Sequence, residues 1–95
     1  MVTHVVLFRM KDRSSASAER ALSALQGMAG RIPGLLELHA GLDNTRSDRS
    51  FDVALITRHA DWDAYVVYRD HPVHEDVKAI MRELADASHS VDFES

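Results

Sequence analysis

One stretch near the start of the chain decides the fold: Val2-Thr3-His4-Val5-Val6-Leu7-Phe8-Arg9-Met10. The centre of this stretch is continuously apolar and rich in β-branched and aromatic side chains, which is typical of a β-strand buried on both faces. Successive side chains of a strand point to opposite faces of the sheet. A sheet built around this strand therefore needs a cover on each of its two faces.

The rest of the chain alternates between helical and strand patterns. Apolar residues recur every three or four positions where we expect helices, and every second position where we expect strands. The expected elements are a helix over 16–31 capped by Ser15 or Ser17, strands over 36–42 and 51–56 joined by a polar loop at 43–50, a helix opened by Asp61, a second helix opened at Pro72, and a strand over 88–94. Pro72 separates the two helices because the residue before a proline avoids the helical conformation.

The order strand, helix, strand, strand, helix pair, strand predicts an α+β fold of the ferredoxin-like βαββαβ type. In this fold an antiparallel sheet carries its helices on one face, and we expect residues 1–95 to form a single domain. The strands over 2–10 and 51–56 carry apolar residues on both faces, so the uncovered face would expose a contiguous apolar patch. We therefore expect a homodimer whose two sheets face each other to form a dimeric α/β barrel. A monomer is the alternative if the second face is only partly apolar.

Composition narrows the function classes. The chain has 95 residues and a formal net charge of −4, which argues against a general nucleic-acid binder or a polybasic membrane-surface protein. It contains no cysteine, which excludes a disulfide scaffold and cysteine-based zinc or redox sites. Its glycines do not form a nucleotide-binding fingerprint, and no apolar run is long enough to span a membrane. We expect a cytoplasmic protein with no cofactor, no nucleic-acid partner and no membrane partner.

The most specific local motif is Tyr68-Arg69-Asp70-His71-Pro72-Val73-His74. Pro72 suits the first position of a helix, which makes His71 the N-cap and His74 the third residue. The positive end of a helix disfavours protonation, so a neutral imidazole that can act as a general base is expected there, although the acidic residues of the same turn act in the opposite direction. Tyr68 could hydrogen-bond a developing enolate oxygen. The alternative is purely structural, with His71 as a cap and Tyr68 in the core.

Two residues outside this motif are candidates for the same chemistry. His4 lies among apolar neighbours on the first strand, and it is either a core histidine or part of a pocket in the barrel interior. Asp92 lies between Val91 and Phe93. It either occupies a solvent-facing position of an edge strand or is a carboxylate that orients a histidine.

The histidines are also potential metal ligands. His71 and His74, with Asp92 or Glu75, could hold a metal ion, but two histidines three residues apart are a weak signal and we expect no metal site. We expect His39 to face solvent or the dimer rim. We assign His59 and His89 to the surface because neither belongs to a sequence motif that pairs it with another candidate residue.

Four segments together resemble the stress-responsive dimeric α/β-barrel (Dabb) family. They are Thr3-His4-Val5-Val6-Leu7-Phe8-Arg9-Met10-Lys11, Ile32-Pro33-Gly34, Tyr68-x-x-His71-Pro72-x-His74 and Val91-Asp92-Phe93-Glu94. The resemblance spans nearly the whole chain and implies a ferredoxin-like homodimer, in agreement with the two-faced strands.

The family includes the plant olivetolic acid cyclase, which closes a linear polyketide by an intramolecular aldol condensation. The resemblance implies that His74 is the general base and Asp92 orients it, that Tyr68 holds the carbonyl or enolate, and that His4 and His71 line the pocket. The favoured hypothesis is thus a dimer that binds a small hydrophobic carbonyl-bearing molecule, with cyclase-like chemistry. A non-catalytic interaction dimer and a metal- or haem-handling monooxygenase-like barrel remain as alternatives.

Overall fold

The computed structural model describes residues 1–95 as seven elements. They are β1 (Val2–Met10), α1 (Ser15–Gln26), β2 (Leu35–Leu42), β3 (Val53–His59), α2 (Trp62–Asp70), α3 (Pro72–Leu84) and β4 (Ala85–Glu94). This order is the predicted ferredoxin-like βαββαβ order with the second helix divided in two. None of the helices has the length and apolar character that a membrane crossing requires.

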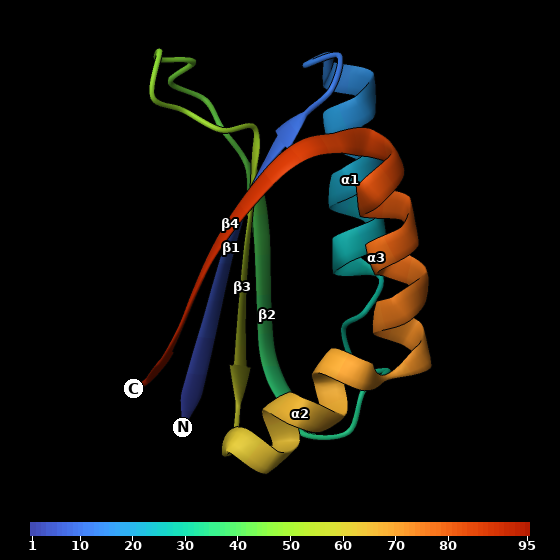
Figure 1. Cartoon of the computed structure of the whole chain (residues 1–95), viewed down its shortest axis with the longest axis vertical. Helices are drawn as coiled ribbons and strands as arrows, with labels where there is room; N and C mark the ends of the chain where they lie inside the picture. The colour runs from blue at the N-terminus through green and yellow to red at the C-terminus, as the bar shows by residue number, and fades with distance from the viewer.

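The four strands form one antiparallel sheet in the order β2-β3-β1-β4. Helices α1 and α3 lie side by side over one face of this sheet, and α2 lies near one end of it (Figure 1). Because β1 is an inner strand, the pairing places His4 opposite Thr57 of β3 and opposite Asp92 of β4. Directly opposed residues of an antiparallel pair share a face. All three side chains therefore lie on the helix-covered face.

The hydrophobic core lies between the helices and this inner face of the sheet. It consists of 12 buried side chains from the sheet, the helices and the turns after α1: Val6, Met10, Ala21, Leu25, Met28, Ile32, Val53, Leu55, Tyr68, Val77, Met81 and Leu84. The members on α1 and α3 recur at the three- and four-residue spacing read from the sequence.

A buried carboxylate anchors the polar loop 43–50 at one end of the sheet. Asp52 accepts a hydrogen bond from the Met10 backbone N–H at 2.7 Å and pairs with the guanidinium groups of Arg13 and Arg46. Burial alone would raise the pKa of Asp52, but these hydrogen bonds outweigh it and hold the pKa below its usual value. The loop is thereby fixed to the end of β1.

Helix α1 is shorter than the sequence pattern predicted, and its cap differs. It ends at Gln26 rather than at residue 31. The chain then passes into turns, and the side chains of Met28 and Ile32 reach the core from these turns. Its N-cap is Ser14, not Ser15 or Ser17, and the Ser14 hydroxyl accepts a hydrogen bond from the Ser17 N–H at 3.1 Å.

Several strand boundaries also differ from the prediction. β2 begins at Leu35 rather than at Leu36, and β3 begins at Val53 rather than at Phe51. β3 continues three residues beyond Ile56, because β1 pairs with it along its whole length and ends with Val2 opposite His59. β4 begins at Ala85, directly after α3, rather than at Ser88. The structure confirms Asp61 as the N-cap of α2 and His71 as the N-cap of α3. It also confirms Pro72 as the first residue of α3.

The outer face of the sheet has no helix over it. Leu7, Ile56, Val91 and Phe93 point to this face from three adjacent strands, and each is between 38% and 63% exposed. The predicted second apolar face is therefore present as a strip across β3, β1 and β4.

Candidate functional site

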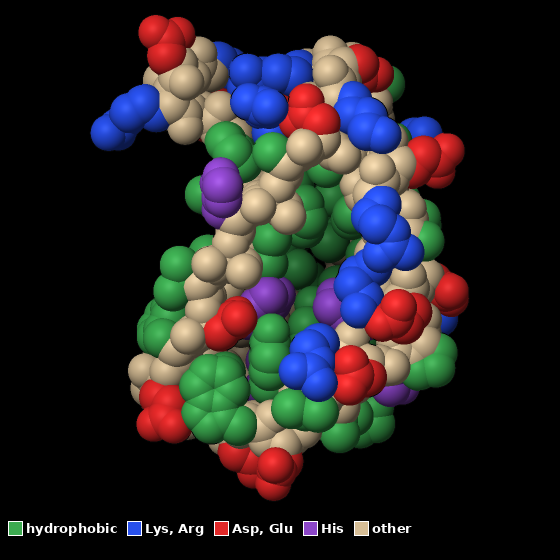
Figure 2. Space-filling view, in the orientation of Figure 1, with side chains coloured by type: hydrophobic (Ala, Val, Ile, Leu, Met, Phe, Trp, Pro, Cys, Tyr) green, Lys and Arg blue, Asp and Glu red, His purple; other side chains and the backbone are tan.

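A cavity of about 410 Å³ opens between α3 and the inner face of the sheet beside β4. Figure 2 shows it as a hollow with an apolar floor, rimmed on the α3 side by Lys and Arg side chains. Ligand pockets in proteins typically measure roughly 300–1,000 Å³. The apolar part of its wall is built mainly by Val6, Phe8, Leu25, Leu55, Val77 and Met81.

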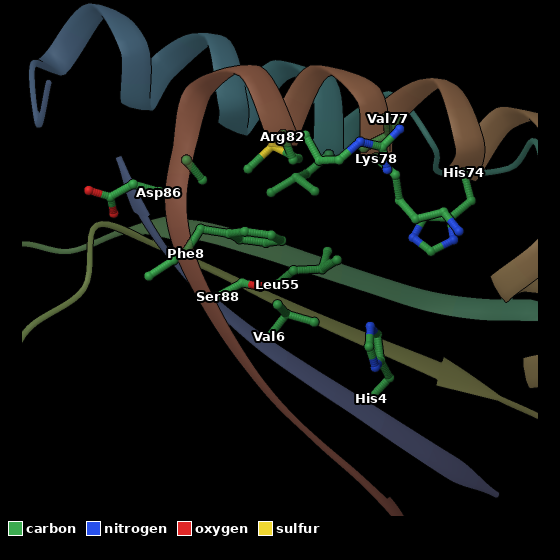
Figure 3. Close-up of a pocket in the computed structure, with 14 residues that line it drawn as sticks. His4, Val6, Phe8, Leu55, His74, Val77, Lys78, Arg82, Asp86 and Ser88 are labelled. Carbon is green, nitrogen blue, oxygen red and sulfur yellow. The ribbon is translucent and has the colours of Figure 1, made fainter. Parts of the chain in front are cut away.

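Two imidazoles belong to this wall, His4 from β1 and His74 from α3. Figure 3 shows them on opposite sides of the pocket, one rising from the sheet and the other hanging from the helix. Both residues were candidates from the sequence, and the fold brings them together from positions 70 residues apart. The wall of the cavity is otherwise mainly apolar, so these imidazoles are its main groups for acid–base chemistry.

The local geometry of the helix junction orients His74. Pro72 is the first residue of α3, and the His71 side chain caps the helix by accepting a hydrogen bond from the Val73 N–H at 3.1 Å. His74 Nδ1 lies 3.1 Å from the backbone carbonyl oxygen of Arg69. Because a carbonyl only accepts, Nδ1 carries the proton and donates it. In the neutral ring, Nε2 is then left with its lone pair free.

The environment of His74 favours this neutral ring. Burial lowers the pKa of His74 below its usual value, and the nearby Lys78 ammonium acts in the same direction. The hydrogen bond to the Arg69 carbonyl opposes them only in part. His74 therefore has the tautomer and the protonation state of a general base near neutral pH.

Asp92 contacts His4 and not His74. Its Oδ1 accepts a short hydrogen bond from His4 Nδ1, and its Oδ2 accepts one from the Tyr65 hydroxyl at 3.3 Å. His74 is oriented by a backbone carbonyl instead. The expected pairing of Asp92 with His74 is thus not formed, because the register of β1 and β4 sets Asp92 directly opposite His4.

Tyr68 lies behind His74, away from the cavity wall. Its side chain is fully buried, its ring stacks on that of His74, and its hydroxyl has no hydrogen-bond partner. Burial raises the pKa of this hydroxyl above its usual value. The expected contact between Tyr68 and a bound carbonyl is not prepared by this arrangement, since the hydroxyl does not line the cavity.

The surface assignment of His59 was wrong. Its side chain has no exposed area, its Nε2 bonds the Thr57 hydroxyl at 2.9 Å, and its ring lies 4.7 Å from that of Tyr68. Burial and the charge of His4 lower the pKa of His59 to about 4. The signal was present in the sequence, because His59 continues the inward-facing phase of Val53, Leu55 and Thr57 once the strand is extended.

The remaining candidates lie outside the cavity. His71 serves as the cap of α3 and does not line the cavity, while His39 and His89 are exposed as expected. No group of three or more His, Cys, Asp or Glu side chains is arranged to hold a metal ion. Tyr65, which the sequence did not single out, belongs to the site because it contacts both Asp92 and the His4 ring.

The fold and the site together define a ferredoxin-like α+β protein with a histidine-lined cavity beneath its helices. The chain belongs to the stress responsive A/B barrel domain family, whose model matches residues 2–95. No curated protein sequence matches the chain significantly.

Solved structures repeat this fold. A dimeric ferredoxin-like protein of unknown function from Thermobifida fusca is 26% identical, with a TM-score of 0.88 over 99% of this chain and 90% of that one. A Dabb family protein from Mesorhizobium loti is 23% identical, with a TM-score of 0.83 over 99% and 95% of the two chains. A hydroxynitrile lyase from Passiflora edulis is 13% identical, with a TM-score of 0.82 over 97% and 90%. The last two likenesses show the fold alone.

Proposed function

We propose that the cavity binds a small, mainly apolar, carbonyl-bearing molecule, and that His74 removes a proton from the carbon next to the carbonyl. One observation carries this proposal: two imidazoles face each other across an otherwise mainly apolar cavity of about 410 Å³. An apolar wall favours the body of such a molecule, and the imidazoles supply the polar groups that act on its carbonyl end.

The two histidines take different roles in this proposal. His74 is the base, because its Nδ1–H is committed to the Arg69 carbonyl and its Nε2 keeps a free lone pair. His4 donates its Nδ1–H to Asp92, and it takes the second role as the imidazolium paired with that carboxylate, in which Nε2 also carries a proton. This Nε2–H then donates to the carbonyl oxygen where negative charge develops. Proton abstraction by one ring and stabilisation of the enolate by the other is the half-reaction that an aldol-type cyclase requires.

The neighbouring side chains act through these two rings. Asp92 and Tyr65 position His4, and Tyr68 packs behind His74. We therefore assign Asp92 and Tyr68 as positioning residues, and His71 as the cap that sets the start of α3. The hydroxynitrile lyase from Passiflora edulis is an enzyme on the same fold, which supports the compatibility of this scaffold with catalysis.

A second copy of the chain forms part of the proposal. The outer face carries an exposed apolar strip, and a contiguous strip of this kind is seldom left uncovered in a monomer. The related protein from Thermobifida fusca is described as dimeric. We propose that two copies of this chain pack these faces together, which leaves each cavity on the helix side of its own sheet.

Two measurements test the function. Binding is followed by the fluorescence of N-phenyl-1-naphthylamine, a neutral apolar probe, and its displacement by 4-phenylbutan-2-one. Chemistry is followed by NMR, as exchange of the protons next to the carbonyl of that ketone for deuterium. We expect probe binding in the micromolar range and exchange faster than in buffer. His74→Gln should slow exchange by about 100-fold or more, since general acid–base catalysis contributes roughly 10²–10⁴-fold.

His39→Gln is the matched control, because His39 is exposed and outside the cavity. It should leave both measurements unchanged. Probe binding without any exchange would contradict the catalytic half of the proposal. Absence of probe binding would contradict all of it and would favour a non-catalytic interaction dimer.

A further inference from the structure

The rim of the cavity carries an arginine without a partner. Lys78 and Arg82 lie one turn apart on α3, and both line the cavity. Lys78 donates to the Arg69 carbonyl at 3.1 Å and forms an ion pair with Glu75. Arg82 forms neither an ion pair nor a side-chain hydrogen bond with any residue. Its guanidinium is permanently charged and has all five N–H donors free for a ligand.

The acidic groups near Arg82 are engaged elsewhere. Asp86 also lines the cavity, but its Oδ1 is bound to Arg9 Nε at 2.9 Å. Glu75 lies within electrostatic range of Arg82, and its carboxylate contacts Lys78. The mouth of the cavity on the α3 side is therefore cationic, as the Lys and Arg side chains in Figure 2 show, although the chain as a whole has a net charge of −4.

A cationic rim beside an apolar cavity suits one class of ligand. The planar guanidinium binds a carboxylate with two parallel hydrogen bonds, and such charge-assisted bonds are about twice as strong as neutral ones. An apolar interior takes the body of the molecule at the same time. We infer that the ligand of this cavity is an organic anion, a carbonyl compound that also carries a carboxylate, and that Arg82 binds this carboxylate at the mouth. This inference rests on the proposed ligand-binding function and names its substrate class.

A matched pair of ketones tests it. 4-Phenylbutan-2-one is neutral, and 4-(3-oxobutyl)benzoate is the same molecule with a carboxylate on its ring. Their dissociation constants come from displacement of N-phenyl-1-naphthylamine. In the wild-type chain we expect the carboxylate to bind about tenfold more tightly, the worth of one charge-assisted hydrogen bond. In Arg82→Gln we expect this preference to disappear, while the neutral ketone binds as before. Arg82→Lys should keep only part of the preference, because it retains the charge but loses the planar fork.

Two control variants separate the possible failures. Arg20→Gln removes a charge from the exposed surface of α1 and should leave the preference unchanged. Ser88→Phe places a ring in the cavity from its exposed β4 side and should abolish displaceable binding of the probe. Probe binding that survives Ser88→Phe, or no binding at all, would overturn the ligand-binding function itself. Equal affinities of the two ketones in the wild-type chain, or a preference that Arg82→Gln leaves intact, would overturn the role of Arg82 and leave that function standing.

Discussion

The imidazole of His74 lies stacked on the phenol ring of Tyr68, with their centroids 4.2 Å apart and their planes inclined by 23°. Tyr68 is fully buried and its hydroxyl has no partner. The face of the tyrosine ring, rather than its hydroxyl, is therefore what supports the imidazole. A tyrosine in a sequence motif can act through the face of its ring or through its hydroxyl, and the motif alone does not distinguish these two roles.

Removal of the Tyr68 hydroxyl should not harm the protein. A buried polar group without a partner is costly, so Tyr68→Phe should raise the free energy of unfolding by up to about 1 kcal/mol and leave ketone deuteration unchanged. Tyr68→Ala should lower the free energy of unfolding by about 3–5 kcal/mol, because it removes a core ring. Urea unfolding measures both. A loss of stability in Tyr68→Phe larger than about 1 kcal/mol would mean that the hydroxyl has a partner in solution.

Because of His59, the free energy of unfolding should decrease as the pH falls. Its pKa is about 4 in the folded chain, against a usual value of 6.5, so between these values the unfolded chain binds more protons. The stabilisation is therefore complete above pH 6.5 and is lost as the pH falls toward 4. The loss amounts to roughly 3 kcal/mol. Urea unfolding of His59→Phe at pH 7 and pH 5 should show a smaller difference than the wild type. Arg20→Gln, a control on the exposed surface of α1, should keep the wild-type difference.

Energetic coupling should follow the observed pairing of Asp92. A double-mutant cycle of His4→Gln with Asp92→Asn should give an interaction energy of about 1 kcal/mol or more, since the two side chains share a hydrogen bond. The cycle of His74→Gln with Asp92→Asn should be additive to within about 0.5 kcal/mol. Urea unfolding of the single and double variants gives both values. The reverse ranking would restore the pairing expected from the family resemblance.

The pH profile of ketone deuteration should reflect a base with a lowered pKa. Burial lowers the pKa of His74 below its usual value of 6.5, and only the neutral ring accepts a proton. The rate should therefore be constant near pH 7 and fall only as the pH drops below 6.5. Rates measured by NMR between pH 4.5 and 8 check this. A midpoint at or above 6.5 in the wild-type profile would place the base elsewhere.

Charge on the outer face should prevent self-association. Ile56 and Val91 are exposed on the strip that we assign to the dimer contact. Ile56→Lys or Val91→Lys should reduce the mass measured by light scattering from twice the chain mass of 10.6 kDa to a single copy. Ser23→Lys on the exposed surface of α1 is the control and should leave the dimer intact. A wild-type chain that is monomeric at high micromolar concentration would contradict the proposed interface.

The sequence was sufficient for the architecture because the deciding signals are local. The apolar run of β1, the alternation in β2 and β3 and the break at Pro72 each act within a few residues. Together they predicted the order of elements and the two apolar faces of the sheet. Boundaries were less well predicted, because the ends of α1 and β3 depend on contacts with distant parts of the chain.

The site was only partly predictable. His4 and His74 were found as candidates, since each stands out in its own segment. The partner of Asp92 was not found, because it depends on the register between β1 and β4, which lie at opposite ends of the chain. The burial of His59 was not predicted, because the predicted strand ended at Ile56, three residues before the end of β3. The free guanidinium of Arg82 could not be seen in the sequence at all, since every other charged group around it has to be placed first.

The interruption between α2 and α3 protects the chemistry of His74 against mutation. The junction leaves the Arg69 carbonyl free to accept hydrogen bonds from His74 and Lys78, while the Val73 N–H turns to His71. A backbone carbonyl is present whatever residue occupies position 69. The path of the main chain thus sets the tautomer of the proposed base. Variants that keep the break at Pro72 should retain this tautomer even when many surrounding side chains are substituted.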